Sequence, residues 1–155
     1  MKRRIFLNTV LASSAAAIAA SKGLLMPREV LASWPKNAFD AGSLQGAMTT
    51  LLGTADAKAS EIIKIELNEI SEDGAHVPIT VLADGLDKVE SISLFSEKNP
   101  IPLLANFEMT DMVANRLTTR IRLAETSYVV VVVKANGRLY SAKKKTKVTI
   151  GGCGG

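Results

Sequence analysis

The stretch Tyr128-Val129-Val130-Val131-Val132-Val133 decides the fold of this chain of 155 residues. β-Branched side chains fit a pleated strand, and a run of them without polar alternation is typical of a central strand buried on both faces. Asn136-Gly137 follows, which is the strongest short signal for a two-residue β-hairpin. The chain should therefore return at once through Arg138-Leu139-Tyr140, and the protein is predicted to be built around a β-sheet.

Other extended segments surround this run. In residues 63–67 and 117–123, apolar side chains alternate with polar ones, which is the pattern of a half-buried strand. Pro78 favours an edge position or the start of a strand, because proline cannot donate a ladder hydrogen bond. The remaining predicted strands lie at 77–81, 89–95, 101–107 and 148–150.

One short amphipathic helix is predicted before the strands. Its apolar residues recur at helical spacing, and Gly53 follows them as a stop signal. We expect this helix to lie against the body or a partner. These apolar residues are Leu44, Ala47, Met48, Leu51 and Leu52. Six or seven short strands with a single helix indicate an all-β protein, an antiparallel β-sandwich in one domain spanning residues 33–150.

The N-terminus has the features of an export signal. Lys2-Arg3-Arg4-Ile5-Phe6-Leu7 is basic and is followed by an apolar, alanine-rich run with a small-residue exit. Arg3 and Arg4 with Phe6-Leu7 resemble the twin-arginine motif, which serves folded cargo. The run is too short and too rich in alanine for a membrane anchor. We expect residues 1–32 to be removed, with cleavage after Ala32, and an earlier cut after Ala20 as the alternative.

Removing this leader changes the charge of the protein. The whole chain holds 19 basic and 15 acidic residues, a net charge of +4. Residues 1–32 contain five of the basic residues and one of the acidic ones, so 14 of each remain. The mature chain is therefore neutral, and its composition gives no support to nucleic-acid binding.

The C-terminus ends in Gly151-Gly152-Cys153-Gly154-Gly155, which contains the only cysteine. Glycine opens most of backbone space, so Gly151, Gly152, Gly154 and Gly155 should form a thin, flexible arm around one thiol. A single cysteine in an exported protein cannot form an internal disulfide, so it is either reactive or paired with another chain. The alternative is a disordered tail without a role.

Two further candidates are weaker. His76 is the only histidine and has no partners at ligand spacing, so no metal site is expected. A Cys153–His76 pair is disfavoured because His76 is remote in sequence and a mobile thiol is poorly positioned for catalysis. Lys143-Lys144-Lys145 with Lys147 reads best as a charged edge strand that blocks aggregation. The alternative is a positive field that draws anions or an acidic partner towards the thiol.

The chain resembles the SoxY family, the substrate-carrying subunits of the bacterial thiosulfate-oxidising system. The glycine–cysteine terminus is the most specific part of this resemblance, and the internal matches support it. The matching stretches are Lys98-Asn99-Pro100, Thr119-Arg120-Ile121, Glu125-Thr126-Ser127, Val133-Lys134-Ala135 and Val148 to Gly155. The resemblance implies an immunoglobulin-like sandwich, a periplasmic location and a heterodimer with a SoxZ-like subunit.

The resemblance also implies a role for Cys153 as the site of covalent substrate attachment. In that scheme a c-type cytochrome enzyme couples thiosulfate to the thiol, a hydrolase releases sulfate, and a sulfane dehydrogenase oxidises the remaining sulfur. The protein would be a carrier and not an enzyme, with no cofactor of its own.

Three alternatives remain. The first is an exported structural module whose cysteine forms an intermolecular disulfide. The second is a ubiquitin-like carrier that is loaded at Gly155, and the third is a thiol enzyme that acts alone.

Overall fold

A computed structural model describes residues 35–110 and 112–150. The predicted export signal at 1–32, with Arg3 and Arg4, lies outside the described residues. The predicted arm at 151–155, with Cys153 and its four glycines, also lies outside them. No helix in the described part of the chain is long and apolar enough to cross a membrane.

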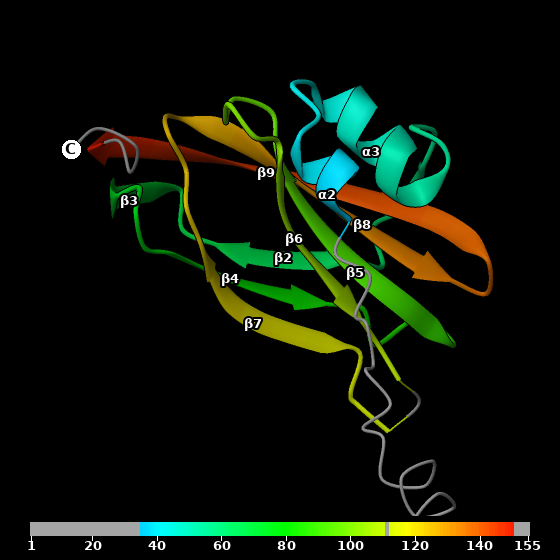
Figure 1. Cartoon of the computed structure of the whole chain (residues 1–155). Coiled ribbons are helices and arrows are strands. Elements are labelled where there is room, and N and C mark those ends of the chain that lie inside the picture. Colours follow the sequence, from blue (N-terminus) through cyan, green and yellow to red (C-terminus); the bar gives the residue numbers. More distant parts are fainter. Residues whose placement is uncertain (1–34, 111, 151–155) are drawn as a thin grey trace, which may run out of the picture. The chain divides into compact units, whose positions relative to one another are not determined.

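The described residues form two short helices and nine strands (Figure 1). The helices are α2 (Lys36–Phe39) and α3 (Leu44–Leu52). The strands are β1 (Lys58–Ala59), β2 (Lys64–Leu67), β3 (Ile70–Asp73), β4 (Val77–Leu82), β5 (Val89–Ser96), β6 (Leu103–Glu108), β7 (Arg116–Ile121), β8 (Ser127–Ala135) and β9 (Arg138–Ile150).

The strands are arranged in two sheets. The larger has the order β1-β9-β8-β5-β6 with β3 also paired to β9, and the smaller has the order β2-β4-β7. The prediction of an all-β sandwich is confirmed. Three details differ from it: β1 and β3 pair with β9 in parallel, the strands are more numerous, and α2 precedes the predicted helix.

The valine run forms β8, which is buried on both faces as predicted. Val129, Val131 and Val133 pack in the core between the two sheets. Val130 and Val132 face the other way and pack with Ala47, Met48 and Phe95 under the helices. Figure 1 shows α2 and α3 on one face of the larger sheet and the smaller sheet on the other. The run has no polar alternation because both of its faces are covered.

The predicted hairpin joins β8 to β9. Asn136 and Gly137 both have positive φ, at 50° and 70°, and Ala135 pairs with Arg138 across them. These dihedral signs are those of the two-residue turn that matches the twist of paired strands. The two extended pieces expected at 138–140 and 148–150 are the ends of one strand of 13 residues, β9.

The predicted helix is confirmed, and it lies against the body. The Ser43 hydroxyl accepts a hydrogen bond from the Gly46 N–H at its start, and Gly53 ends it with φ 82°.

Pro78 lies in β4, which pairs with both β2 and β7, so the edge position is wrong. The alternative holds: Pro78 is near the start of β4, before the β2 pairing begins at Ile79.

Candidate functional site: the end of the final strand

Strand β9 is fixed to the body up to its last described residue. Ile150 pairs with Asp73 of β3, and its carbonyl accepts a hydrogen bond from the Gly74 N–H at 2.8 Å. The Thr149 hydroxyl donates to the Glu72 carbonyl at 3.1 Å. Main-chain and side-chain hydrogen bonds therefore join the end of β3 to the end of β9 at Thr149 and Ile150.

The other side of β9 is held by Thr126, which lies just before β8. Its hydroxyl accepts a hydrogen bond from the Val148 N–H at 3.0 Å and contacts the Val148 carbonyl at 3.4 Å. Cys153 follows Ile150 by three residues. A fully extended chain covers at most about 3.6 Å per residue, so the Cα atom of Cys153 lies within about 11 Å of that of Ile150.

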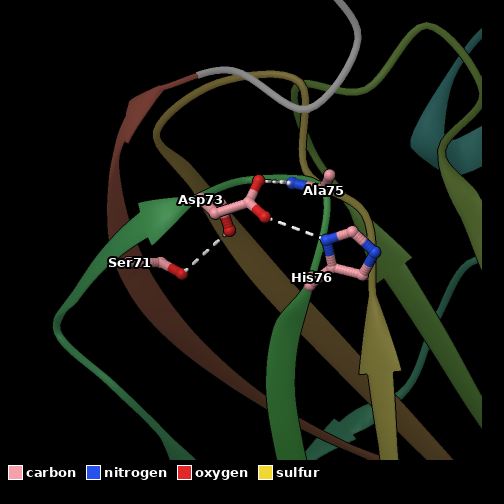
Figure 2. Close-up of polar contacts among 4 residues, drawn as sticks. All are labelled: Ser71, Asp73, Ala75 and His76. Carbon is pink, nitrogen blue, oxygen red and sulfur yellow. Dashed lines mark hydrogen bonds and ion pairs between the residues drawn. The ribbon is translucent and has the colours of Figure 1, made fainter.

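The turn beside Ile150 carries a compact polar cluster, shown in Figure 2. The Ala75 N–H donates to Asp73 Oδ1 at 2.7 Å, and His76 Nδ1 lies 2.9 Å from Asp73 Oδ2. The Ser71 hydroxyl donates to the Asp73 carbonyl at 3.3 Å. Both carboxylate oxygens of Asp73 are thus used to hold the turn that binds Ile150.

The contacts of Asp73 shift its titration. The hydrogen bond from His76 lowers the pKa of Asp73 most, followed by the hydrogen bond from the Ala75 N–H. The positive charge of Arg122 adds a smaller contribution in the same direction. Asp73 is therefore a stable anion at neutral pH.

His76 is remote from Cys153 in the sequence but close to the end of β9 in the structure. The turn that carries it is bonded to Ile150 through Gly74, so His76 lies near the point from which Cys153 extends. Separation in the sequence is therefore no argument against a Cys153–His76 pair, and the argument from a mobile thiol stands as a prediction. The side chain of His76 is 71% exposed, however, and its polar contact is with the Asp73 carboxylate. Within residues 35–110 and 112–150 no cluster of three or more metal-ligating side chains is found.

The lysine run lies where β9 has an open edge. Beyond the β8 hairpin, β1 pairs with β9 at Tyr140 and Ser141, and β3 pairs with it from Lys147 onwards. The stretch between them, which holds Lys143, Lys144 and Lys145, has no second strand partner among the described strands. This agrees with the predicted charged edge. Lys144 differs from its neighbours, because its ammonium group donates to the Ile65 carbonyl at 3.4 Å.

These features define a class of protein: a two-sheet β-sandwich whose final strand is anchored on both sides at its C-terminal end. Comparison with known proteins agrees. The family model described as sulfur oxidation protein SoxY matches residues 48–153. The chain belongs to the SoxY family.

Two solved structures show the same architecture. The sulfur carrier protein SoxY from Chlorobium limicola f thiosulfatophilum is 36% identical, with a TM-score of 0.62, over 75% of this chain and 100% of that chain. A superoxide reductase (neelaredoxin) from Ignicoccus hospitalis is 18% identical, with a TM-score of 0.50, over 74% of this chain and 91% of that chain. The second likeness concerns the fold alone. A search of curated protein sequences found no match.

Sequence reasoning missed the residues that anchor β9. Glu72-Asp73-Gly74 lies between the predicted strands at 63–67 and 77–81, which indicates a turn but no contact with β9. Thr126 is part of the family resemblance, which gives it no role. An acidic residue followed by Gly-Ala-His is a weak local signal of a capped turn. The pairing of β3 with β9 has no local signal, because the two strands are far apart in the sequence.

Proposed function

We propose that the protein is a periplasmic sulfur carrier that holds thiosulfate-derived groups covalently on the Cys153 thiol. The observation that carries this proposal is the 36% identity with a sulfur carrier protein along the whole of that chain. The family match supports it, because the matched residues end at Cys153 itself. The thiol would be presented to partner enzymes, which supply the catalytic groups.

The loading step joins two sulfur atoms. The thiolate is the reactive form of cysteine, and its sulfur forms a bond with the outer sulfur of thiosulfate. The thiol proton is released, and two electrons pass to a c-type cytochrome enzyme. The product is a cysteine S-thiosulfonate with a single negative charge.

The next step releases sulfate. Water attacks the terminal sulfonate sulfur in the active site of a hydrolase, and the bond between this sulfur and its neighbour breaks. Sulfate and one proton leave, and a persulfide remains on Cys153. A sulfane dehydrogenase then oxidises the remaining sulfur to a sulfonate group with oxygen from water, and the electrons pass to the acceptor of that enzyme while protons are released. Throughout this cycle the carrier keeps the intermediate from diffusing away.

The anchoring of β9 supports a scheme in which this protein carries the intermediate and the partner enzymes catalyse the reactions. The thiol has to enter clefts of several enzymes, so the residues around it need little bulk, and the flanking glycines meet this need. The body needs to hold the other end of the arm, and the bonds to Gly74, Glu72 and Thr126 do so. A SoxZ-like subunit completes the proposed carrier as a heterodimer, and the twin-arginine signal would export the two together in folded form.

The experiment is intact-mass analysis of the heterodimer after incubation with thiosulfate and the cytochrome enzyme. Wild-type protein should gain the mass of one thiosulfonate group, and Cys153→Ser should gain none while keeping the same circular dichroism spectrum. An adduct on the Cys153→Ser protein would refute the assignment. An adduct on Gly155 would identify a ubiquitin-like carrier. A permanent disulfide-linked dimer that accepts no sulfur would identify a structural module.

A further inference from the structure

The outer face of β9 carries three lysines in alternating positions: Lys143, Lys145 and Lys147. All three are exposed, whereas Lys144 and Thr146 between them point the other way. Their cross-strand partners on β8 show which face of the larger sheet the lysines occupy. Lys143 pairs with Val130, which packs under the helices, so the lysines lie on the helix side of the larger sheet.

Tyr128 lies between two of these lysines. It pairs directly with Lys145, and its ring centre is 5.7 Å from the Lys145 ammonium and 5.0 Å from that of Lys143. Tyr128 is itself 38% exposed. We call Tyr128, Lys143, Lys145 and Lys147 the lysine face. Tyr128 does not belong to the buried cluster under the helices, whereas Val130, two positions further along β8, does.

The lysine face is not neutralised by the protein itself. In the described part of the chain the ion pairs are His76–Asp73 and Lys134–Glu90, and neither involves these lysines. The mature chain has as many acidic as basic residues, so this face is a local excess of positive charge. Three carboxylates are placed beside it by main-chain bonds and strand pairing: Glu97, whose N–H donates to the Tyr128 carbonyl, Glu69, whose carbonyl accepts from the Lys147 N–H, and Glu72 of β3.

Protection of an open edge does not account for the whole face. Lys143 and Lys145 lie in the stretch of β9 without a second strand partner, but Lys147 pairs with Ile70 of β3. The edge is closed there, so a charge at Lys147 has no pairing to prevent. Ile70 is itself 59% exposed, which places an apolar side chain beside the last lysine.

We infer that the lysine face is the docking surface for an acidic protein surface, namely the rim of the catalytic cleft in the enzyme that loads Cys153. The inference rests on the proposed carrier function. Cys153 follows Lys147 by six residues, so its Cα atom lies within about 22 Å of that of Lys147. An enzyme bound to the lysine face therefore has the thiol within reach of its own cleft.

Opposite charges on two proteins accelerate their encounter, and salt screens this effect. Tyr128 supplies an aromatic contact at the centre of the face, as is typical of residues that dominate binding energy. The lysines would thus govern how fast the complex forms, whereas the chemical step inside the cleft would not depend on them.

The test uses the full-length heterodimer and the purified c-type cytochrome enzyme, with loading measured by mass as a function of ionic strength. In Lys143→Glu/Lys145→Glu/Lys147→Glu, kcat/KM at low salt should fall about 10-fold or more, and its salt dependence should be lost or reversed. The kcat at saturating carrier should stay unchanged. The matched control Lys36→Glu/Lys58→Glu/Lys64→Glu has the same change in charge and should load like the wild type at every salt concentration.

The outcomes separate the two proposals. If the wild type is not loaded at all, the carrier function fails, and this inference falls with it. If the triple variant is loaded at the wild-type rate with the wild-type salt dependence, the docking surface is refuted and the carrier function stands. Loss of the heterodimer in the triple variant, or binding of the wild type to vesicles of anionic lipid that the variant lacks, would assign the face to the partner subunit or to a membrane, and would also overturn the inference.

Discussion

At the scale of single residues, Asp73 connects the turn at 73–76 to the end of β9. Its carboxylate is bound by the Ala75 N–H and by His76, and its main chain pairs with Ile150. Because these hydrogen bonds favour the charged form, the pKa of Asp73 is lower in the folded protein than its ordinary value of 3.8. The stabilisation from ionised Asp73 is present above that ordinary value and is lost as the pH falls through the lower folded-state pKa.

This predicts the effect of His76→Ala on Asp73. The largest cause of the shift is removed, so the pKa of Asp73 should rise, yet remain below its ordinary value because the Ala75 N–H still donates. Carboxyl NMR titration measures this. Glu90, whose pKa is lowered by Lys134 and the Gly137 N–H, is the internal control and should not change. An Asp73 pKa that is the same in both proteins would contradict the assigned contact.

At the scale of elements, the hydroxyl of Thr126 holds one side of the end of β9, opposite the bonds to β3. Thr126→Val keeps the shape of the side chain but removes its hydrogen bonds to the main chain of Val148. A hydrogen bond of this kind contributes about 1 kcal/mol, so the Val148 amide should exchange with solvent roughly five times faster. Hydrogen-exchange NMR measures this rate. Thr126→Ser retains the hydroxyl and should protect Val148 nearly as well as the wild type, and equal exchange in the two variants would show that the hydroxyl does not hold the strand.

The elements also show which parts of the fold local sequence can predict. The valine run, the Asn136-Gly137 turn and the spacing of α3 are local signals, and each of them is confirmed. The sequence leaves two positions open for Pro78, an edge or the start of a strand, and the second is confirmed. The choice between them could not be made from the sequence, because pairing decides which neighbours a strand has. The parallel partners of β9 could not be predicted, since β1 and β3 contain two and four residues.

The candidate site also has a part that the sequence predicts and a part that it does not. The composition of the C-terminus marks Cys153 directly, because an isolated thiol among glycines is visible in the sequence. The turn that anchors β9 comes from residues 72–76, and nothing in those residues indicates that they bond to Ile150. The role of Cys153 stays a prediction, whereas the turn that binds the end of β9 is a structural feature that sequence reasoning missed.

At the scale of the whole molecule, the larger sheet has two cores. The core under the helices is smaller, and Phe95 is its largest fully buried side chain. Phe95→Ala should lower the free energy of unfolding by about 3–5 kcal/mol, because a large cavity is left between β5 and the helices. Urea unfolding measures this loss. Ile101→Ala is the control, since Ile101 is 54% exposed and its truncation should change stability by less than about 0.5 kcal/mol. A loss as small as that of the control would show that the helices pack only loosely on the sheet.

The bond between Glu72 and Thr149 spans 77 positions of the sequence. A contact of such high sequence separation forms late, after the entropy of closing a long loop has been overcome by the rest of the sandwich. A chain still emerging from the ribosome has β3 long before it has the end of β9, so the contacts that hold Ile150 form only after all of β9 has been made. The anchoring of Ile150 thus depends on the integrity of the whole sandwich, and a misfolded copy would lack the bonds of Glu72 and Gly74 to the end of β9.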